Sequence, residues 1–398
     1  MIVSGIAVNI NLNITNPPNP LYQRGLKLIM KTYHIVTIGC QMNKSDSERL
    51  AAVLEKQGYK KTGDKYQADL VVINTCGVRQ SAEDRAYGLI PRIKKENFKA
   101  KIILTGCLVG RVDVKCRLKE YVNVWLPIGQ MTNDKFPMTK IPPTPFVKGE
   151  KCDDYLKIKP KYNSKFSAFV PIGNGCNNFC SYCVVPYARG REVWRPAKDI
   201  INEVKCLVKR RYKEIILIAQ NVNSYKSQIP PNPPLSRGEI DFADLLKMVN
   251  NIKGNFHIKF ATSHPKDMSD KLIKTMADCS KVLKEIHLPA QSGDNQVLKK
   301  MNRKYTVGHY KKIIKKIRRL MPRVLISTDI IVGFPGETRK QFNNTVKLFK
   351  EIKFNQAFIA RYSPRPGTAA YKLKDDVTPT EKQKRWLELN SLINYDQK

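Results

Sequence analysis

Segments that read as β-strands alternate with segments that read as helices along most of this chain, and this alternation limits the possible folds more than any other feature. Strands separated by helices favour a parallel sheet, because each helix returns the chain to the edge where the next strand begins. Apolar runs predict strands at Tyr33–Gly39, Ala68–Thr75, Lys101–Gly106, Val122–Ile128, Phe166–Ile172, Glu214–Gln220, Phe256–His264, Lys284–Gln291, Val324–Phe334 and Gln356–Ser363. Helices are predicted at Ser45–Gly58, Gln80–Glu96, Ala197–Arg211, Phe242–Ile252, Arg339–Ile352 and Pro379–Ile393.

The predicted strands fall into two series, which indicate an α/β protein with two main domains. The first series, which ends at Ile128, predicts a parallel sheet, and its first helix has Ser45 and Asp46 as the expected N-terminal caps. The second series consists of about six strand–helix units and predicts an incomplete (β/α) barrel. In such a barrel the chemistry takes place at the C-terminal ends of the strands.

Three cysteines lie close together directly after the first strand of the second series, in the pattern Cys176-x-x-x-Cys180-x-x-Cys183. Three thiolates can hold three irons of a 4Fe–4S cube and leave the fourth iron open. The alternatives are a structural zinc site and a chance grouping. Zinc would require a fourth Cys or His nearby, and none follows within the expected few residues. The spacing therefore favours an iron–sulfur cluster with one open iron.

A second set of three cysteines is spread over the first series. Cys40, Cys76 and Cys107 each come directly after a predicted strand, and a glycine adjoins each of them. The C-terminal ends of neighbouring parallel strands share one edge of the sheet, so three thiols at such ends can converge. Glycine would let the backbone crowd around a bulky group. Each cysteine alone would be an ordinary buried one, and the repeated placement leaves two alternatives, a second cluster and ordinary burial.

The composition indicates a polyanionic partner and a reducing compartment. Lys and Arg total 71 against 34 acidic residues, a formal charge of +37, and such an excess favours binding to phosphates. A generally basic proteome is the alternative. There is no apolar run long enough for a transmembrane helix, and the start of the chain lacks a signal-peptide pattern. Because the cysteines are grouped as metal ligands are, we expect a cytoplasmic protein.

Three Pro-rich strings interrupt the pattern, each containing Pro-Pro-x-Pro followed by a basic residue and Gly. Repeated proline prevents regular structure, so we expect exposed loops, either sites for a polyproline-binding partner or inserted repeats.

The chain is therefore expected to consist of an extension without ordered structure, a first domain, a linker with a Pro-rich insertion, the barrel and a C-terminal helix. Their expected bounds are 1–31, 32–140, 141–160, 161–378 and 379–398.

The two cysteine triplets, in this order, resemble the radical SAM methylthiotransferases. Several strings resemble the MiaB type of tRNA methylthiotransferase in particular, and the resemblance covers about residues 32–390. These strings are Gly39-Cys-Gln-Met-Asn, Val184-Val-Pro-Tyr-Ala-Arg-Gly-Arg-Glu, Gln220-Asn-Val-Asn-Ser-Tyr, Thr262-Ser-His-Pro, His287-Leu-Pro-Ala-Gln-Ser-Gly and Ser327-Thr-Asp-Ile-Ile-Val-Gly-Phe-Pro-Gly-Glu-Thr. Each is weak alone, and together they are specific.

The resemblance implies a flavodoxin-like N-terminal domain, a radical SAM barrel of the (β/α)6 kind, two 4Fe–4S clusters and S-adenosyl-L-methionine (SAM). One triplet would hold the cluster that cleaves SAM to a radical, and the other an auxiliary cluster that carries the sulfur. Sulfur would enter at carbon 2 of isopentenyl-adenosine next to the tRNA anticodon, and a second SAM would methylate it. Both open irons would then face one cavity. The resemblance thus implies six catalytic and metal-binding residues, which are Cys176, Cys180, Cys183, Cys40, Cys76 and Cys107.

Polar residues that follow the barrel strands are candidates for binding SAM or the base, and structural capping of the loops is the alternative. Tyr182 would lie against the SAM adenine or serve packing. Arg189 and Arg191 would neutralise a carboxylate or phosphate, or pair with Glu192. The full set of cofactor-binding candidates is Tyr182, Gln220, Asn221, Ser263, Gln291 and Ser292.

Several expectations concern partners and alternatives. The resemblance implies a tRNA anticodon stem-loop as substrate, a low-potential electron donor and a sulfur or Fe–S donor, and we expect a monomer. Family members end in a small RNA-binding β-barrel, the TRAM domain, which we expect to be absent here. The alternatives are an enzyme acting on threonylcarbamoyl-adenosine in tRNA and an inactive RNA-binding remnant.

Overall fold

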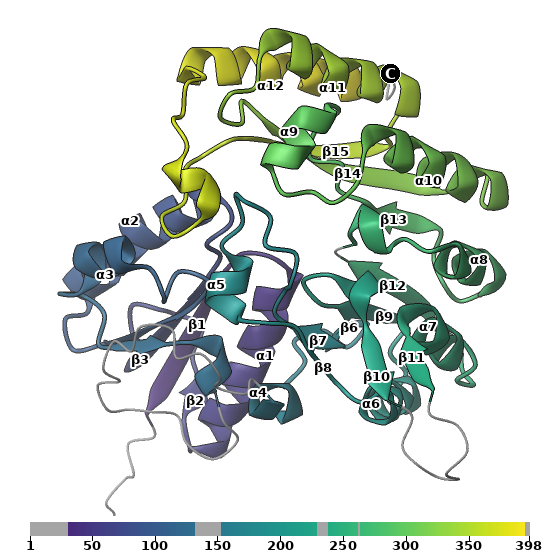
Figure 1. Cartoon of the computed structure of the whole chain (residues 1–398). Coiled ribbons are helices and arrows are strands. Elements are labelled where there is room, and N and C mark those ends of the chain that lie inside the picture. The colour runs from purple at the N-terminus through teal and green to yellow at the C-terminus, as the bar shows by residue number, and fades with distance from the viewer. Residues whose placement is uncertain (1–30, 132–152, 229–237, 262, 395–398) are drawn as a thin grey trace, which may run out of the picture. The chain divides into compact units, whose positions relative to one another are not determined.

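A computed structural model describes residues 31–131, 153–228, 238–261 and 263–394 of the chain (Figure 1). Residues 1–30 of the expected N-terminal extension, the first two Pro-rich strings and the third string up to residue 237 lie outside the described residues, as does Thr262. None of the helices in the described ranges is long and apolar enough to cross a membrane.

The N-terminal part contains a five-stranded, all-parallel sheet with the strand order β2-β1-β3-β4-β5. This order is that of the flavodoxin-like fold, so the predicted fold of the first domain is confirmed. Strands β3 and β4, which are neighbours in this order, are buried along almost their whole length, which explains their largely apolar sequence. The strands are β1 Thr32–Ile38, β2 Lys60–Lys61, β3 Leu70–Thr75, β4 Lys101–Gly106 and β5 Val124–Leu126.

Helices cover both faces of this sheet. On one face α1, residues Gln41–Lys56, packs Leu50 and Leu54 into a core with β1 and β3. On the other face α2, residues Gln80–Glu96, buries Ile90 in a second core to which α3, residues Val112–Leu118, also contributes. The two cores make this a doubly wound domain, in which ligands bind at the carboxyl ends of the strands.

The start of α1 differs from the prediction. The helix begins at Gln41, with Cys40 as the residue before it, and Asn43 Oδ1 accepts the Cys40 backbone N–H at 3.3 Å. Ser45 and Asp46 therefore do not cap the helix but lie inside it, fully buried. Their polar atoms have other partners, since Ser45 Oγ accepts a hydrogen bond from Arg49 at 2.7 Å and Asp46 pairs with Arg189. A Ser-Asp pair predicts a cap only where no such partner competes for it.

The second series forms two three-stranded parallel sheets, β12-β9-β6 and β13-β14-β15. A parallel bridge between Ile258 and Val282 joins them, so six strands follow one another as in the predicted incomplete barrel. Their bounds lie within the predicted segments or at their ends, and they are β6 Ser167–Pro171, β9 Glu214–Ile218, β12 His257–Ala261, β13 Glu285–His287, β14 Leu325–Val332 and β15 Gln356–Arg361. Two short antiparallel pairs were not predicted, β7 Gly173–Asn174 with β8 Val193–Trp194 and β10 Lys226–Gln228 with β11 Glu239–Asp241.

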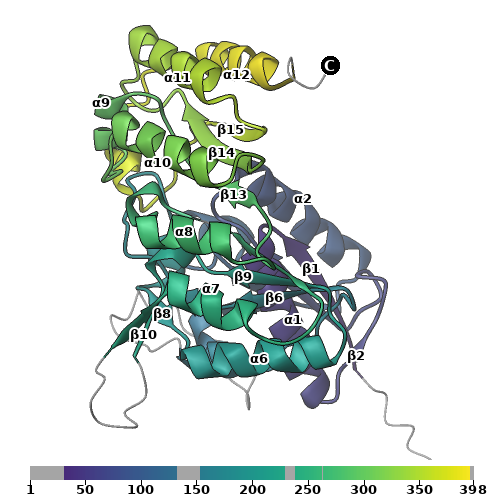
Figure 2. The ribbon, with the colours of Figure 1, turned by 90° about the vertical axis from the view of Figure 1, so that its right-hand side faces the viewer.

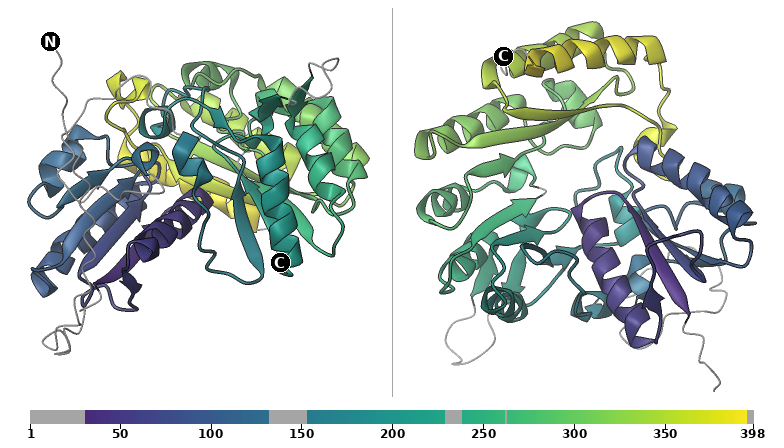
Figure 3. Two further views of the ribbon diagram at one scale, coloured as in Figure 1. Left: turned by 90° about the horizontal axis from the view of Figure 1, so that it is seen from below. Right: turned by 180° about the vertical axis from the view of Figure 1, so that it is seen from behind.

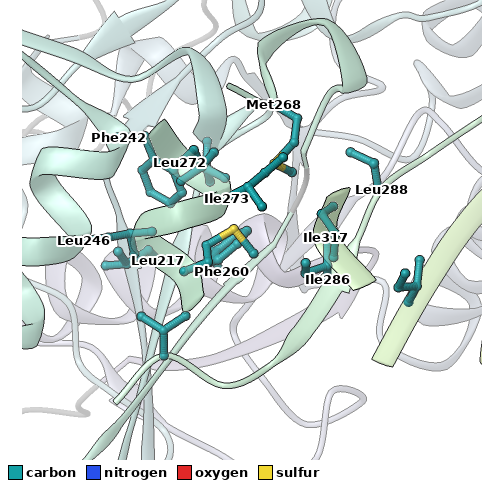
Figure 4. Close-up of a cluster of buried hydrophobic side chains, with 14 of the residues drawn as sticks. Leu217, Phe242, Leu246, Phe260, Met268, Leu272, Ile273, Ile286, Leu288 and Ile317 are labelled. Atoms are coloured by element: carbon teal, nitrogen blue, oxygen red, sulfur yellow. The ribbon is translucent and has the colours of Figure 1, made fainter. Parts of the chain in front are cut away.

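The barrel helices pack on the outer side of these strands. Along one side α6, α7, α8 and α10 contact one another in sequence (Figure 2), and α12 lies beside α11 (Figure 3). In the core beneath them Phe242 and Phe260 meet edge to face, with ring centroids 5.3 Å apart (Figure 4). The helices are α4 Asp153–Lys157, α5 Val185–Arg189, α6 Ala197–Lys209, α7 Phe242–Asn250, α8 Asp270–Asp278, α9 Asn295–Lys300, α10 Val307–Leu320, α11 Arg339–Ile352 and α12 Pro379–Asn394.

The glycine at the end of β4 provides a test of how closely the strand ends approach. Gly106 has a φ of +93°, and a Cβ there would lie 2.2 Å from the Thr75 carbonyl oxygen. We expect Gly106→Ala to lower the free energy of unfolding by about 2 kcal/mol or more, because the backbone is left-handed and β3 cannot retreat. Urea titration followed by circular dichroism measures this.

Gly88 is the matched control, since it lies within α2 and a Cβ there would meet nothing within 4 Å. Gly88→Ala should raise the free energy of unfolding by about 0.5–1 kcal/mol. Equal stability of the two alanine variants would contradict the described geometry.

Candidate functional site

The first cysteine triplet lies at one edge of the N-terminal sheet. Strands β1, β3 and β4 are neighbours, and Cys40, Cys76 and Cys107 follow them. The hydrogen bonding between neighbouring strands continues into the cysteines. The Cys76 N–H donates to the Ile38 carbonyl, and the Cys107 N–H donates to the Thr75 carbonyl, both at 2.9 Å. The structure thus brings together the three residues whose placement after strands had predicted their convergence.

Two of the adjoining glycines leave room for this convergence. A Cβ on Gly39 would lie 3.0 Å from Cys76 Cβ, and a Cβ on Gly77 would lie 2.8 Å from the Cys107 carbonyl oxygen. The Gly77 contact excludes a side chain there, and a Cβ on Gly39 would also lie 2.4 Å from Asn43 Oδ1, which excludes one at that position. The two glycines therefore let the cysteine-bearing loops approach one another closely.

The pKa values of two of these thiols, Cys76 and Cys40, are raised. Burial raises the pKa of Cys76 to about 11, and the charges of Cys107 and Cys40 add to the rise. Burial also raises the pKa of Cys40, which the Arg189 charge partly offsets and Cys107 reinforces. Thiolates in such a site become favourable only when a cation neutralises them, and metal binding there releases protons. The donor set is soft sulfur, which suits iron–sulfur clusters.

The second triplet lies in the loop that follows β6. The Cys176 N–H donates to the Gly190 carbonyl at 3.1 Å, and the Cys183 N–H to the Cys180 carbonyl at 3.0 Å. Between them Phe179 has a φ of 46°, a left-handed conformation that a bulky residue seldom adopts. Burial raises the pKa of Cys176 to about 11. It raises the pKa of Cys183 as well, and the Cys180 charge contributes.

Neither triplet is a ready-made site for a single metal ion. Within the described ranges, no three His, Cys, Asp or Glu side chains meet the geometry of a preformed metal-ion site. The case for clusters therefore depends on the placement of the cysteines, the soft donors and the raised pKa values.

A buried ion pair joins the two triplets. Arg189, at the end of α5, donates from Nη2 to Asp46 Oδ2 of α1 at 2.6 Å, and the two side chains are 2% and 0% exposed. Asn174 accepts from the same guanidinium at 3.1 Å, and the Tyr155 hydroxyl also donates to Asp46. Arg189 was expected to neutralise a SAM carboxylate or an RNA phosphate, or to pair with Glu192, but its partner in the structure is Asp46. Sequence reasoning missed Asp46 as its partner because that residue was read as a helix cap.

Charges on the first-domain side of the site affect groups that follow the first barrel strand. The charge of Cys107 contributes to the raised pKa of Cys183, although burial and Cys180 contribute more. Burial works against the Arg189 charge, but Asp46 and then Cys107 hold the pKa of this guanidinium well above its usual value. Arg189, which follows the second triplet in the chain, therefore interacts with two groups of the first domain, Asp46 and Cys107.

A second contact joins the end of the barrel to the Cys76 loop. Arg365 donates to Glu83 at 2.7 Å and to the Val78 carbonyl at 3.2 Å. The same carboxylate also accepts two hydrogen bonds from Arg111. The Val78 N–H in turn donates to Cys76 Sγ at 3.3 Å. The loop that carries Cys76 is thus held from two directions.

Four of the predicted cofactor-binding residues carry buried side-chain oxygens without a hydrogen-bond partner, and they follow barrel strands β9, β12 and β13. An unpaired buried oxygen costs about 1–3 kcal/mol, so such a group at strand ends points to a polar ligand. Gln291 also has a φ of 64°, strained for a residue other than glycine. The atoms are Gln220 Oε1, Asn221 Oδ1, Ser263 Oγ and Gln291 Oε1.

The other two candidates have partners within the protein. Ser292 Oγ accepts from the Asp294 N–H at 3.2 Å, as in the capping alternative. Tyr182 packs against a small core that includes Met301 and Phe334, so part of its ring serves packing. Asn221, despite its free oxygen, donates through Nδ2 to Asp267 at 2.7 Å.

One contact with the second triplet, made by Arg303, was not predicted, whereas His264 is one of the polar residues at the ends of the barrel strands that were candidates for binding SAM or the base. Arg303 donates through Nη1 to Cys180 Sγ at 3.6 Å and is buried. His264 follows β12, and burial, with the Arg303 and Lys266 charges, lowers the pKa of its imidazole to about 2, so it is neutral at pH 7. Nothing in the sequence around Arg303 signals this contact, because the partner lies more than a hundred residues away.

We expect Arg189→Met to lower the free energy of unfolding by about 3–5 kcal/mol, because it leaves the buried Asp46 carboxylate without its cation. The double variant with Asp46→Asn should recover part of this loss. Chemical denaturation measures both.

The exposed pair Lys226–Glu239, with side chains 62% and 54% exposed, is the control. Lys226→Met should cost less than about 1 kcal/mol. An Arg189→Met variant as mildly affected as Lys226→Met would show that the ion pair does not join the two halves of the site.

Two family models match separate parts of the chain. Residues 170–349 match the radical SAM superfamily, and residues 32–126 match the family described as "Uncharacterized protein family UPF0004". The radical SAM match includes the triplet Cys176, Cys180 and Cys183 and extends over most of the barrel. The other match includes the triplet Cys40, Cys76 and Cys107.

Curated relatives match over nearly the whole chain. A tRNA-2-methylthio-N(6)-dimethylallyladenosine synthase of Clostridium botulinum is 42% identical over 383 residues, 92% of this chain and 82% of the relative. A relative of the same name from Clostridium novyi is 44% identical and covers 92% and 81%. Among solved structures, the radical S-adenosylmethionine methyltransferase TsrM from Kitasatospora setae has a TM-score of 0.54 at 13% identity, over 86% of this chain and 75% of that one. This last likeness shows the fold alone.

Proposed function

Since the chain belongs to the radical SAM methylthiotransferase family, we propose that it inserts a methylthio group at carbon 2 of dimethylallyl-adenosine in tRNA, next to the anticodon. The observation that carries the proposal is the identity above 40% over 92% of the chain to relatives named for this reaction. Both cysteine triplets are intact within the matched length. The convergence of each triplet supports the same conclusion.

Members of this family use SAM and 4Fe–4S clusters, and the residues of this chain fit both. We assign one cluster to Cys176, Cys180 and Cys183 and an auxiliary cluster to the other triplet. When bound, the first supplies the electron that cleaves SAM to a radical, and the second supplies the sulfur. The unpaired oxygens at the barrel strand ends fit a ligand rich in donors, as SAM is.

The protein's own part in the reaction is to bind and orient. In the proposed site Gln220, Ser263 and Gln291 hold SAM at the barrel strand ends. The Arg189–Asp46 pair holds the two cysteine-bearing loops at a constant separation, because neither charge can leave its partner without a large desolvation cost. His264, neutral at pH 7, adds no charge that would repel a cationic sulfonium.

The remaining partners follow from the chemistry of the proposed reaction. The formal charge of +37 favours a phosphate-rich substrate such as the tRNA anticodon stem-loop. A low-potential electron donor and a sulfur or Fe–S donor are needed to renew the site. We propose that the protein acts in the cytoplasm, as a monomer.

The test is anaerobic incubation of the iron-loaded protein with SAM, dithionite and tRNA carrying dimethylallyl-adenosine, followed by nucleoside mass spectrometry. The proposal predicts the methylthio derivative of that nucleoside. The same derivative of threonylcarbamoyl-adenosine, from tRNA that carries it, would identify the alternative substrate. Deoxyadenosine without any thiolated nucleoside would contradict the substrate assignment, and neither product would indicate an inactive RNA-binding remnant.

Cysteine substitutions separate the two assigned clusters. The intact protein should hold about eight irons, and Cys76→Ala about four. That variant should still cleave SAM but form no thiolated nucleoside, because the auxiliary triplet is broken. Cys116→Ala, which removes an exposed cysteine of α3, should change neither iron content nor product. A methylthio product from Cys76→Ala would overturn the auxiliary role.

Ser263→Ala tests the SAM-binding assignment. If the unpaired Ser263 hydroxyl binds SAM, its loss should raise the dissociation constant about fivefold, equivalent to about 1 kcal/mol. Equilibrium dialysis with the reconstituted protein measures the affinity. Thr105→Val removes a similarly unpaired hydroxyl from β4 and should leave SAM binding unchanged. Equal affinities for Ser263→Ala and the parent protein would contradict the assignment.

A further inference from the structure

Arg303 is a buried arginine without a carboxylate partner. It is 7% exposed. Its Nε donates to the Tyr305 hydroxyl and its Nη2 to the Pro289 carbonyl, both at 2.9 Å, while Nη1 donates to Cys180 Sγ at 3.6 Å. In the described part of the chain no Asp or Glu forms an ion pair with it. Of the four other buried arginines in the described residues, Arg189, Arg365 and Arg385 each have a carboxylate partner, and Arg49 bonds only to Ser45.

This arrangement leaves the charge of Arg303 uncompensated by protein carboxylates. A carbonyl and a hydroxyl satisfy the N–H groups but do not neutralise the cation, and an unpaired buried charge costs several kcal/mol. An anion near the guanidinium would offset this cost. Cys180 is the group at the end of its third hydrogen bond, and as a cluster ligand it would be a thiolate.

The backbone around Arg303 is fastened to the cysteine loop, so this contact is not a chance rotamer. Asn302 Nδ2 donates to the Phe179 carbonyl at 2.8 Å. The Ser181 N–H donates to the Met301 carbonyl at 3.0 Å, and Ser181 Oγ donates to the Lys300 carbonyl at 2.8 Å. These bonds join the residues on either side of Cys180 to those directly before Arg303. The distance between guanidinium and thiol is thus set by both segments.

We propose that Arg303 raises the reduction potential of the cluster held by Cys176, Cys180 and Cys183, through a charge-assisted N–H···S hydrogen bond to Cys180. The inference rests on the proposed function, which assigns a cluster to this triplet. In the step concerned one electron passes from a low-potential donor to the cluster, whose charge becomes more negative by one. No proton moves and no covalent bond changes, and the fixed positive charge stabilises the reduced state more than the oxidised state.

The test is a redox titration monitored by electron paramagnetic resonance, with Cys76→Ala as the parent so that only this cluster is present. In Arg303→Met the charge and the donors are lost while an unbranched apolar stem is kept. At a fixed potential the ratio of reduced to oxidised cluster should fall about tenfold, which for one electron is about 60 mV. Arg303→Lys keeps the charge but not the planar fork, and its ratio should lie between the two.

Arg385→Met is the matched control, because Arg385 is an equally buried barrel arginine whose partner is Glu337. It should leave the potential unchanged. The same samples are assayed for SAM affinity, since a guanidinium that serves the SAM carboxylate would change that affinity and not the potential of the SAM-free cluster.

An unchanged potential in Arg303→Met would overturn the inference, whether or not SAM affinity falls. Loss of the cluster from both Arg303 variants, with the fold retained by circular dichroism, would also overturn it and assign the residue to assembly. Failure of the Cys76→Ala parent to hold four irons is a different result, because it would contradict the proposed function itself.

Discussion

The ion pair between Arg189 and Asp46 is the interaction on which the arrangement of the site depends. Asp46 lies in the second turn of α1, the helix that begins directly after Cys40, and Arg189 ends α5, which directly follows the loop of Cys183. Both charges are almost fully removed from water, so separating them would leave each uncompensated in the interior. The two cysteine-bearing parts of the chain are therefore joined where their chemistry must meet.

Each cysteine triplet is assembled by backbone geometry. In the first domain three adjacent parallel strands end at one edge, and glycines next to the cysteines remove the side chains that would keep the loops apart. In the barrel, hydrogen bonds from Ser181 and Asn302 tie the cysteine loop to the segment that carries Arg303. The unpaired oxygens of Gln220, Ser263 and Gln291 then mark the strand ends where a polar cofactor would complete the site.

The sequence predicted the fold and the cysteine positions well, because both depend on local patterns. Helices such as Gln80–Glu96 and Arg339–Ile352 have the predicted bounds, and the barrel strands lie within the predicted apolar runs or end with them. The parallel first sheet and the six-strand barrel follow from the alternation of strands and helices, whereas the flavodoxin-like order of the first sheet was implied only by the family resemblance. Cysteines placed after strands were correctly predicted to converge in the first domain.

The errors concern buried charges, which one sequence cannot reveal. Ser45 and Asp46 have the composition of a helix cap, and only the folded chain shows that α1 begins earlier and that Asp46 faces Arg189. The contact between Arg303 and Cys180 joins residues far apart in the chain, so no local pattern reports it. Ser292 was expected to bind a cofactor or to cap a loop, and its bond to the Asp294 N–H could be assigned only from coordinates.

The central claim is that the two triplets hold clusters close to one another in one site. The most direct measurement is the electron paramagnetic resonance spectrum of the fully reduced protein, compared with the spectra of Cys76→Ala and Cys183→Ala, each of which retains one intact triplet. The account predicts that the spectrum of the intact protein differs from the sum of the two, because neighbouring paramagnetic clusters interact magnetically. A spectrum equal to that sum would contradict it.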